Sequence, residues 1–351
     1  MRFDDLYVAG AASWLPSAVT VDEAIADGSC DPAAARRCGA KAVTVAGAGE
    51  CATGMAARAA RVALERAAVA AGDVGLLLHA TLYDQGHDLW GAASHVQALA
   101  LAGEHPACPA LEVRQVSNGG MGAVELAAAF LRAGTGRPAA LLTAGDVFCP
   151  PGFDRWRSDP GTVYADGGAA LVLSRAGGFA RLRSLVTVSE PRLEGMHRGD
   201  HPFAPAVDGR VRRVDLDECK RQFLARAGRA AAIARVSGGQ RRALNGALEQ
   251  AGLTVAGIDA FVLPHLGRRR LEAGFFQPFG IAPERSTCDW GRGVGHLGGG
   301  DQFAGLAHLV ESKRVSPGDR VLLAGIGAGF TWSAAVLEIV EVPSWPEQAS
   351  R

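Results

Sequence analysis

The chain has 351 residues, of which 48% are hydrophobic and only 6% aromatic, so it can bury a large core. Its 36 basic and 36 acidic residues cancel, which removes the strong positive field expected of a protein that binds nucleic acid or a membrane surface. No run approaches the roughly 20 apolar residues that span a bilayer. The seven cysteines form no CxxC pair and the N-terminus lacks a secretion signal, so we expect a cytoplasmic protein with reduced thiols.

The first half of the chain contains a strand, a turn, a helix and a second strand in close succession. Residues 111–113 are typical of a strand and lead into the turn 117–120, Ser-Asn-Gly-Gly. A helix rich in small residues is predicted over 123–134, and an apolar strand over 139–146.

The second half repeats this plan. The glycine-rich run 293–300 leads to a predicted helix over 302–314 and a strand over 321–329. The glycine pairs 119–120 and 299–300 are 180 residues apart, and the apolar strands that follow them are 181 apart. Upstream, residues 72–82 have a counterpart in 256–266.

We therefore predict an α/β protein with two similar halves, residues 1–178 and 179–351. The strands are mostly unbroken apolar runs, which indicates sheets covered on both faces. The alternative is that any two α/β segments look alike at this level of detail. Between the halves, residues 184–213 are rich in Pro, Gly and charge and suit a crossover and surface loop. The stretch 210–242 then carries ten Lys or Arg against three acids on a helical pattern.

Ser117 is the candidate nucleophile. It lies between a short strand and a helix, where free N–H groups and the helix dipole favour developing negative charge. The following glycines would let a substrate approach the backbone. The alternative is that Ser117 is simply the N-cap of the helix, a position that serine favours.

His296 and Asp301 are the candidate base and its orienting acid. They are five residues apart across the triple glycine 298–300, which allows a tight reversal that brings the carboxylate back to the imidazole. With Ser117 they would complete a nucleophile-activating triad. A degenerate or purely structural site is the alternative.

Four motifs resemble the β-ketoacyl-ACP synthase III branch of the thiolase-fold enzymes, over roughly Asp73 to the C-terminus. They are CPALEVRQVS before and including Ser117, VYADGGAALVL, VLPHLGRRRLEAGFFQPFGI with His265, and VLLAGIGAGFTWSAAVLEI. The resemblance implies a duplicated αβαβα fold of five layers with two mixed sheets, and a homodimer. It places His265 among the catalytic residues, and an oxyanion hole at the backbone N–H groups of Ser117 and Ala328.

The chain departs from this family at two positions. Ser117 stands where the family has a cysteine, and His296 stands where it has an asparagine. A serine hydroxyl is far less acidic than a thiol and needs a general base, so one physical reason explains both changes. Loss of the asparagine argues against decarboxylative condensation. Similar substitutions occur in synthase III-like proteins of antibiotic pathways, which act as acyltransferases or as starter-unit enzymes of polyketide assembly.

The sequence thus predicts an acyltransferase of secondary metabolism. It would move an acyl group from a thioester of acyl carrier protein (ACP), or of CoA, through an acyl-Ser117 ester to a second carrier thiol or a hydroxyl. His265 would position the thioester or move the acceptor's proton, unless it is an ordinary core histidine. Arg268, Arg269 and Arg270 would contact the acidic carrier. No organic cofactor or metal is expected beyond the phosphopantetheine arm of the substrate carrier. The alternatives are a starter-unit ketosynthase III that condenses an acyl-CoA with malonyl-ACP, and a non-catalytic ACP-binding protein.

Overall fold

A single continuous sheet organises the protein. The computed structural model describes residues 1–101, 103, 108–134, 136–203 and 213–346. Within these residues the sheet has nine strands. Their order is β5 (Ala110–Val113), β4 (Val74–Ala80), β6 (Ala139–Asp146), β7 (Gly167–Ser174), β1 (Tyr7–Trp14), β8 (Ala180–Ser189), β11 (Thr331–Ile339), β10 (Arg320–Gly327) and β9 (Ala260–Val262).

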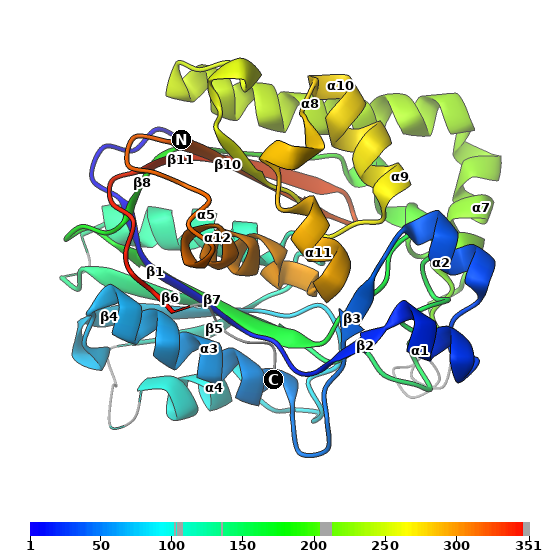
Figure 1. The fold of residues 1–351 in the computed structure, drawn as a ribbon, viewed down its shortest axis with the longest axis horizontal. Helices are drawn as coiled ribbons and strands as arrows, with labels where there is room; N and C mark the ends of the chain where they lie inside the picture. The colour runs from blue at the N-terminus through cyan, green and yellow to red at the C-terminus, as the bar shows by residue number, and fades with distance from the viewer. Residues whose placement is uncertain (102, 104–107, 135, 204–212, 347–351) are drawn as a thin grey trace.

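Helices cover this sheet in layers (Figure 1). On the outer face of the N-terminal strands lie α3 (Ala52–Ala67) and α4 (Ala92–Leu101), and on that of the C-terminal strands lie α8 (Arg229–Ala251) and α10 (Gln277–Phe279). The central layer holds α5 (Gly119–Arg132) and α12 (Asp301–Glu311). The remaining helices are α1 (Val21–Ala26), α2 (Pro32–Cys38), α7 (Leu216–Ala227), α9 (Arg268–Leu271) and α11 (Cys288–Val294). Among the described helices, none is long and apolar enough to cross a membrane.

The two halves share one topology, as the duplicated pattern predicts. In the first, β4 pairs with β6 in parallel and β6 with β7 antiparallel. In the second, β9 pairs with β10 in parallel and β10 with β11 antiparallel. The five-layered α/β architecture is therefore confirmed. The two expected sheets are joined end to end, because Tyr7 and Val8 of β1 pair with Arg181 and Ala180 of β8. The predicted division after residue 178 falls between β7 and β8 and stays a prediction.

Small residues explain how the layers approach so closely. α3 buries a row of alanines against β1 and β7, and both strands carry glycines beneath it. A Cβ atom on Gly10 would lie 2.1 Å from the Ala63 carbonyl oxygen, and one on Gly168 would lie 2.3 Å from the carbonyl carbon of Met55. The high Gly and Ala content and the low aromatic content therefore reflect backbone-to-backbone packing between helix and sheet.

The matched glycines of the two halves meet at the centre of the molecule. A Cβ on Gly120 would lie 2.1 Å from the Gly299 carbonyl oxygen. Gly120 is in the first turn of α5, and Gly299 is in the 3-10 turn η6 (Gly298–Gly300) that leads into α12. The 180-residue spacing therefore brings together the N-terminal ends of the two central helices.

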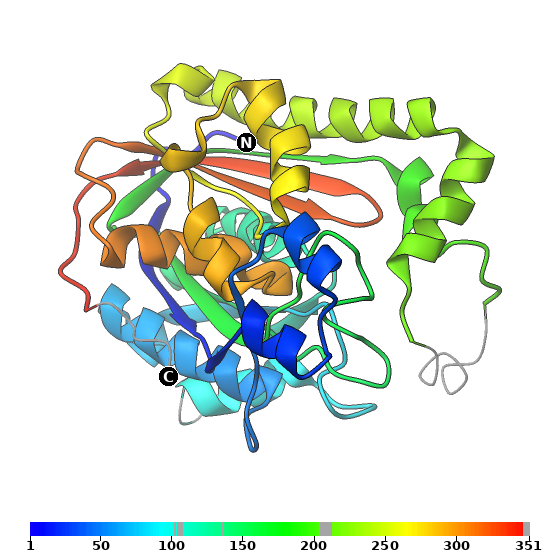
Figure 2. The same ribbon diagram turned by 45° about the vertical axis from the view of Figure 1, so that its right-hand side comes forward.

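The described part of the basic stretch, residues 213–242, contains α7 and the start of α8, so it is divided between two helices. α7 and α8 meet at Gly228, which has a φ of +80°, and Figure 2 shows them turning a corner of the molecule. Arg210, the first residue of that stretch, lies outside the described residues. A separate ribbon of β2 (Ala18–Thr20) and β3 (Ala42–Thr44) carries α1 and α2 between its strands.

Candidate active site

Ser117 lies on a tight turn between β5 and α5. The Asn118 N–H donates to the Gln115 carbonyl (3.1 Å) and the Gly119 N–H to the Val116 carbonyl (3.0 Å). Val116 has a φ of +51°, a left-handed conformation that a β-branched residue rarely adopts. The N-cap of α5 is Asn118, so the alternative role for Ser117 as the cap does not hold. The turn presents a partly exposed serine at the start of a helix.

Two glycines of β10 pack directly against this turn. A Cβ on Gly325 would lie 2.4 Å from Asn118 Oδ1, and one on Gly327 would lie 2.2 Å from the Gln115 carbonyl oxygen. Ala328 follows in the turn between β10 and β11. The glycine run thus brings the segment that contains Ala328 close to the turn that contains Ser117.

His296 connects Ser117 to Asp301. The Ser117 Oγ lies 2.8 Å from His296 Nε2, and His296 Nδ1 lies 2.6 Å from Asp301 Oδ2. An ionised carboxylate only accepts hydrogen bonds, so Nδ1 carries the proton and Nε2 accepts from the Ser117 hydroxyl. The imidazole is 2% exposed, which shields both hydrogen bonds from water.

The main chain and one aromatic ring hold His296 in place. Its N–H donates to the Val163 carbonyl (2.8 Å), and its carbonyl accepts from the Ala165 N–H (2.9 Å). The ring of Tyr164 meets the imidazole edge to face, with centroids 5.0 Å apart. His296 is therefore attached through its backbone to the segment that precedes β7.

Asp301 is buried and accepts several hydrogen bonds. Besides His296, the N–H groups of His265 and Leu297 donate to it, each at 2.8 Å. The second of these bonds closes the glycine turn, as the sequence predicts. Burial alone would raise the pKa of Asp301, but electrostatic attraction to the neighbouring His265 and His296 and these hydrogen bonds hold it below its usual value. Asp301 is therefore an anion at neutral pH.

His265 is held by the same carboxylate. Its Nδ1 donates to the Gly295 carbonyl at 2.8 Å and lies 3.3 Å from Asp301 Oδ1. Its Nε2 is buried and has no partner among the described residues. Trp290 packs edge to face against the ring, with centroids 5.2 Å apart. The site thus contains two imidazoles anchored through Nδ1, one bonded to Ser117 and one whose buried Nε2 makes no hydrogen bond among the described residues.

The three arginines of α9 have different surroundings. Arg268 and Arg269 are exposed. Arg270 turns inward and binds Asp159 with both terminal nitrogens, each at 2.7 Å. The prediction that Arg270 faces the carrier overlooked this acid, because sequence spacing gave no sign that residues 159 and 270 meet.

Sequence reasoning also missed two residues beside the site. Tyr164 lies within the VYADGGAALVL motif, and its available signal was an aromatic residue two positions before Asp166, whose following glycines begin β7. Asp146 ends β6 in the core and accepts from the N–H groups of Leu82 (3.0 Å) and Tyr83 (2.8 Å). Burial raises the pKa of Asp146 to about 7. A carboxylate at the end of an otherwise apolar strand was its signal.

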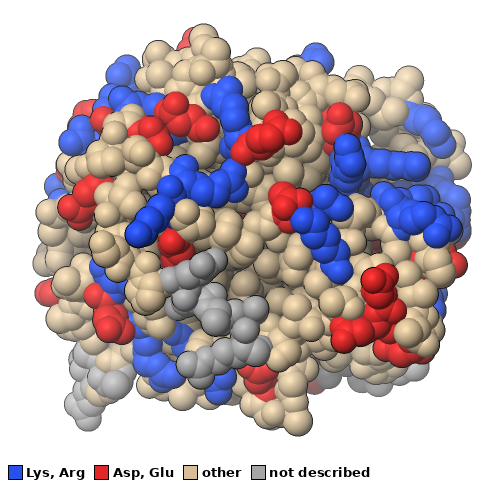
Figure 3. Space-filling view, in the orientation of Figure 1, with Lys and Arg blue, Asp and Glu red and all other residues tan. Residues whose placement is uncertain are grey.

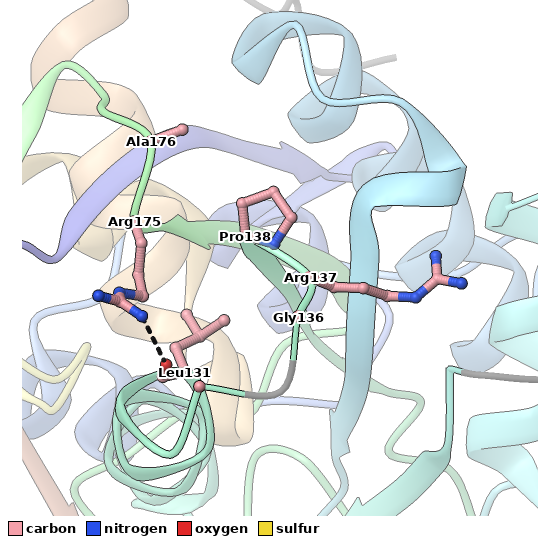
Figure 4. Close-up of a pocket in the computed structure, with 7 residues that line it drawn as sticks. Leu131, Gly136, Arg137, Pro138, Arg175 and Ala176 are labelled. Atoms are coloured by element: carbon pink, nitrogen blue, oxygen red, sulfur yellow. Dashed lines mark hydrogen bonds between the residues drawn. The ribbon is translucent and has the colours of Figure 1, made fainter.

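The pocket in Figure 4 lies away from this site. It is lined by Leu131, Arg137 and Arg175 at the C-terminal end of α5, whereas Ser117 is at the other end of that helix. The part of the chain that the structure describes holds no group of three or more His, Cys, Asp or Glu arranged to bind a metal.

The C-terminal half matches a known family model. Residues 248–339 match the model described as 3-oxoacyl-[acyl-carrier-protein (ACP)] synthase III C terminal. This region includes His265, His296 and Asp301.

Curated relatives match over most of the chain. A β-ketoacyl-[acyl-carrier-protein] synthase III of Rhizorhabdus wittichii is 30% identical over 300 residues, which cover 84% of this chain and 86% of the relative. The protein of that name from Hyphomonas neptunium is 27% identical over 342 residues, which cover 95% and 98%.

Solved structures share the whole fold. ChlB3, described as an acyltransferase, has a TM-score of 0.91 and 33% identity, with 97% of this chain and 100% of that chain covered. OleA of Xanthomonas campestris with bound cerulenin has a TM-score of 0.75 and 22% identity, with 96% and 98% covered, and shows the fold alone. These matches identify the chain as an enzyme of the β-ketoacyl-[acyl-carrier-protein] synthase III family of thiolase-fold acyl-transferring and condensing enzymes.

Proposed function

We propose that this enzyme transfers an acyl group through an ester on Ser117. The observation that carries the proposal is the continuous relay from the Ser117 hydroxyl to His296 (2.8 Å) and on to Asp301 (2.6 Å). These distances and the tautomer fixed by Asp301 are what a general base needs in order to activate a serine.

In the first half-reaction, Ser117 Oγ attacks the thioester carbonyl carbon while His296 Nε2 takes the hydroxyl proton. Asp301 stabilises the resulting imidazolium. The backbone N–H groups of Ser117 and Ala328 would bind the oxyanion, each contributing about 3 kcal/mol. The intermediate then breaks the carbon–sulfur bond, and the thiolate of the pantetheine arm takes the proton from His296.

In the second half-reaction, a carrier thiol or a hydroxyl group attacks the acyl-Ser117 ester. His296 Nε2, which has given its proton to the thiolate, takes the proton of the attacking group. His265, whose buried Nε2 has no partner among the described residues, would help to position the thioester. The carbon–oxygen bond of the ester breaks, and Ser117 recovers its proton from His296.

Acyl transfer is favoured over carbon–carbon bond formation by the two departures from the family. A base–serine pair is suited to loading and releasing an ester, and the asparagine that assists decarboxylation is replaced by His296. The acyltransferase description of ChlB3 supports this assignment. A role in polyketide antibiotic biosynthesis rests on the resemblance of the sequence motifs alone. The names of the curated relatives favour a second candidate, a starter-unit ketosynthase III, which would release CO₂ from malonyl-ACP.

The carrier would dock on a basic surface at α2 and α9. Exposed Arg36 and Arg37 end α2, which packs against α9 and its exposed Arg268 and Arg269. Figure 3 shows basic side chains gathered over these helices, at the right of the view. A hollow of about 290 Å³ beside Arg37 is lined in part by Val163, whose carbonyl binds His296. We place the entry of the carrier's arm there.

The open edge of the sheet supports a homodimer. β5 pairs only with β4 among the described strands, and Leu111 on it is 54% exposed. Leu99 on the adjacent α4 is also exposed. A second copy that adds its own β5 antiparallel would satisfy this edge and cover both leucines. Sedimentation equilibrium should give twice the chain mass, and a monomer at micromolar concentration would contradict the proposal.

Ser117→Ala should abolish acylation. Wild-type protein incubated with candidate acyl-ACP or acyl-CoA thioesters should gain the mass of one acyl group, located on Ser117 by peptide mapping. Ser117→Cys should still be acylated, because the family nucleophile would then stand beside His296. Ser312→Ala, at the C-cap of α12, is the matched control. Acyl transfer at the wild-type rate by Ser117→Ala would rule out the ester intermediate.

Asp301→Asn should slow acylation by about 10³- to 10⁴-fold, because an amide does not fix the tautomer or stabilise the imidazolium. The folded-state pKa of Asp301 lies below its unfolded value of about 3.9, so its contribution to stability is full above pH 4 and is lost as pH falls further. The substitution should flatten the pH dependence of the unfolding midpoint in that acid range. Asp289→Asn, on an exposed side chain, is the control. Single-turnover rates within twofold of wild type would exclude a triad.

Charge reversal of Arg268 and Arg269 together should raise the KM for an acyl-ACP by roughly tenfold at low salt, because steering of the acidic carrier is lost. The effect should shrink as ionic strength rises. Arg61→Glu, exposed on α3, should leave the KM unchanged. A KM that does not respond to the double substitution would place the carrier elsewhere.

A further inference from the structure

A cluster of charges around a buried carboxylate lies between α7, α9 and the segment 159–165. Asp159 is at its centre, with a side chain that is 3% exposed. Arg270 donates to both of its oxygens at 2.7 Å, and Lys220 donates to Oδ1 at 2.6 Å. The Tyr164 hydroxyl donates to Oδ2 at 3.3 Å. One carboxylate thus binds two cations and a phenol.

The ionisation states in this cluster are fixed. Burial alone would raise the pKa of Asp159, but Arg270 and then Lys220 hold it well below its usual value. Burial and the charge of Asp159 raise the pKa of Tyr164 well above its usual value. Tyr164 therefore stays protonated, and its hydroxyl donates a hydrogen bond to Asp159, which stays ionised.

Arg270 also holds the start of the segment that follows Asp159. Its guanidinium donates to Thr162 Oγ1 at 2.5 Å and to the Pro160 carbonyl at 2.8 Å. Its neighbour Gly267 donates its N–H to the Gly161 carbonyl at 3.0 Å. Both terminal nitrogens of Arg270 thus bind one short stretch of chain, and the side chain is 32% exposed.

The other end of that stretch binds His296. Val163 and Ala165 make the two main-chain hydrogen bonds to His296, and the ring of Tyr164 between them packs against its imidazole. Only five residues lie between Asp159, whose carboxylate is bound by Arg270 of α9, and Ala165, the last residue whose backbone binds His296. Because these bonds are short and buried, a shift of Asp159 would be transmitted to the imidazole.

We propose that Asp159, Arg270 and Tyr164 are positioning residues for His296, an inference that rests on the acyl-transfer function proposed above. Arg270 and Asp159 fix the segment, and Tyr164 sets the orientation of the imidazole that directs Nε2 at Ser117. Arg270 is therefore not a carrier-binding residue, unlike its exposed neighbours. Its loss should lower kcat for every thioester, because the defect lies at the base.

The test compares Tyr164→Phe and Arg270→Lys with wild type. Tyr164→Phe keeps the ring and the ion cluster and removes only the hydrogen bond to Asp159. Arg270→Lys keeps the charge and loses the two-pronged contact. Single-turnover acylation of Ser117 is measured with an acyl-ACP and with the same acyl group on N-acetylcysteamine, which lacks a carrier. Proton NMR follows the low-field resonance of His296 Nδ1–H.

Arg175→Lys is the matched control. Arg175 also binds an aspartate, Asp5, at 2.9 Å, and donates to the Leu131 carbonyl, but at the distant end of α5 (Figure 4). It should leave both rates and the resonance at wild-type values. Thermal unfolding checks that each variant is folded, and Tyr164→Phe stays informative if Arg270→Lys is unstable.

We expect both variants to lower kcat by roughly tenfold with both thioesters, to change KM by less than twofold, and to shift the resonance of His296. A raised KM for acyl-ACP alone, with kcat unchanged, would make Arg270 a carrier-binding residue and overturn the proposal. Wild-type rates in both variants would overturn it as well. If wild-type protein is never acylated on Ser117, the acyl-transfer function itself fails, and that result is distinct from either of these.

Discussion

The contact between Gly120 and Gly299 is the constraint on which the site depends. These glycines come from equivalent turns of the two halves, and any side chain on Gly120 would collide with the Gly299 carbonyl. Their contact brings the start of α5, next to Ser117, against the turn that follows His296. Ser117 and His296, the proposed nucleophile and base, therefore come from different halves of the chain, and the 2.8 Å bond between them lies beside this contact.

Two buried carboxylates, Asp301 and Asp159, are proposed to orient His296. Asp301 binds the imidazole at Nδ1 and fixes its tautomer, whereas Asp159 acts through Tyr164 on the face of the ring. Both are held ionised by neighbouring cationic or imidazole groups. Because each carboxylate accepts several hydrogen bonds, neither can move without breaking contacts to other elements. The base is thus oriented from two directions.

The local sequence pattern was sufficient to predict the repeated strands and the turn between His296 and Asp301. The strand 139–146 and the fold-back of Asp301 depend on periodicity and on glycine, which act within a few residues. The inward direction of Arg270 could not be predicted, because its partner Asp159 is 111 residues away. The φ of +51° at Val116 could not be predicted either, because valine disfavours that conformation and tertiary packing imposes it. The break at Gly228, by contrast, could have been predicted, because glycine disfavours a helix interior. The charge pattern alone indicated one helical stretch.

The seam between the halves has a consequence for how the enzyme would lose activity. β1 and β8 share only two residue pairs, although residues 1–6 add hydrogen bonds to 182–185, and α12 packs against β1 and β7 of the other half. The catalytic relay crosses that same central layer. A small loosening of α5 against α12 would separate Ser117 from His296 while the strands within each half stayed paired. We therefore expect activity to be lost when these layers loosen, before the helices and strands unfold.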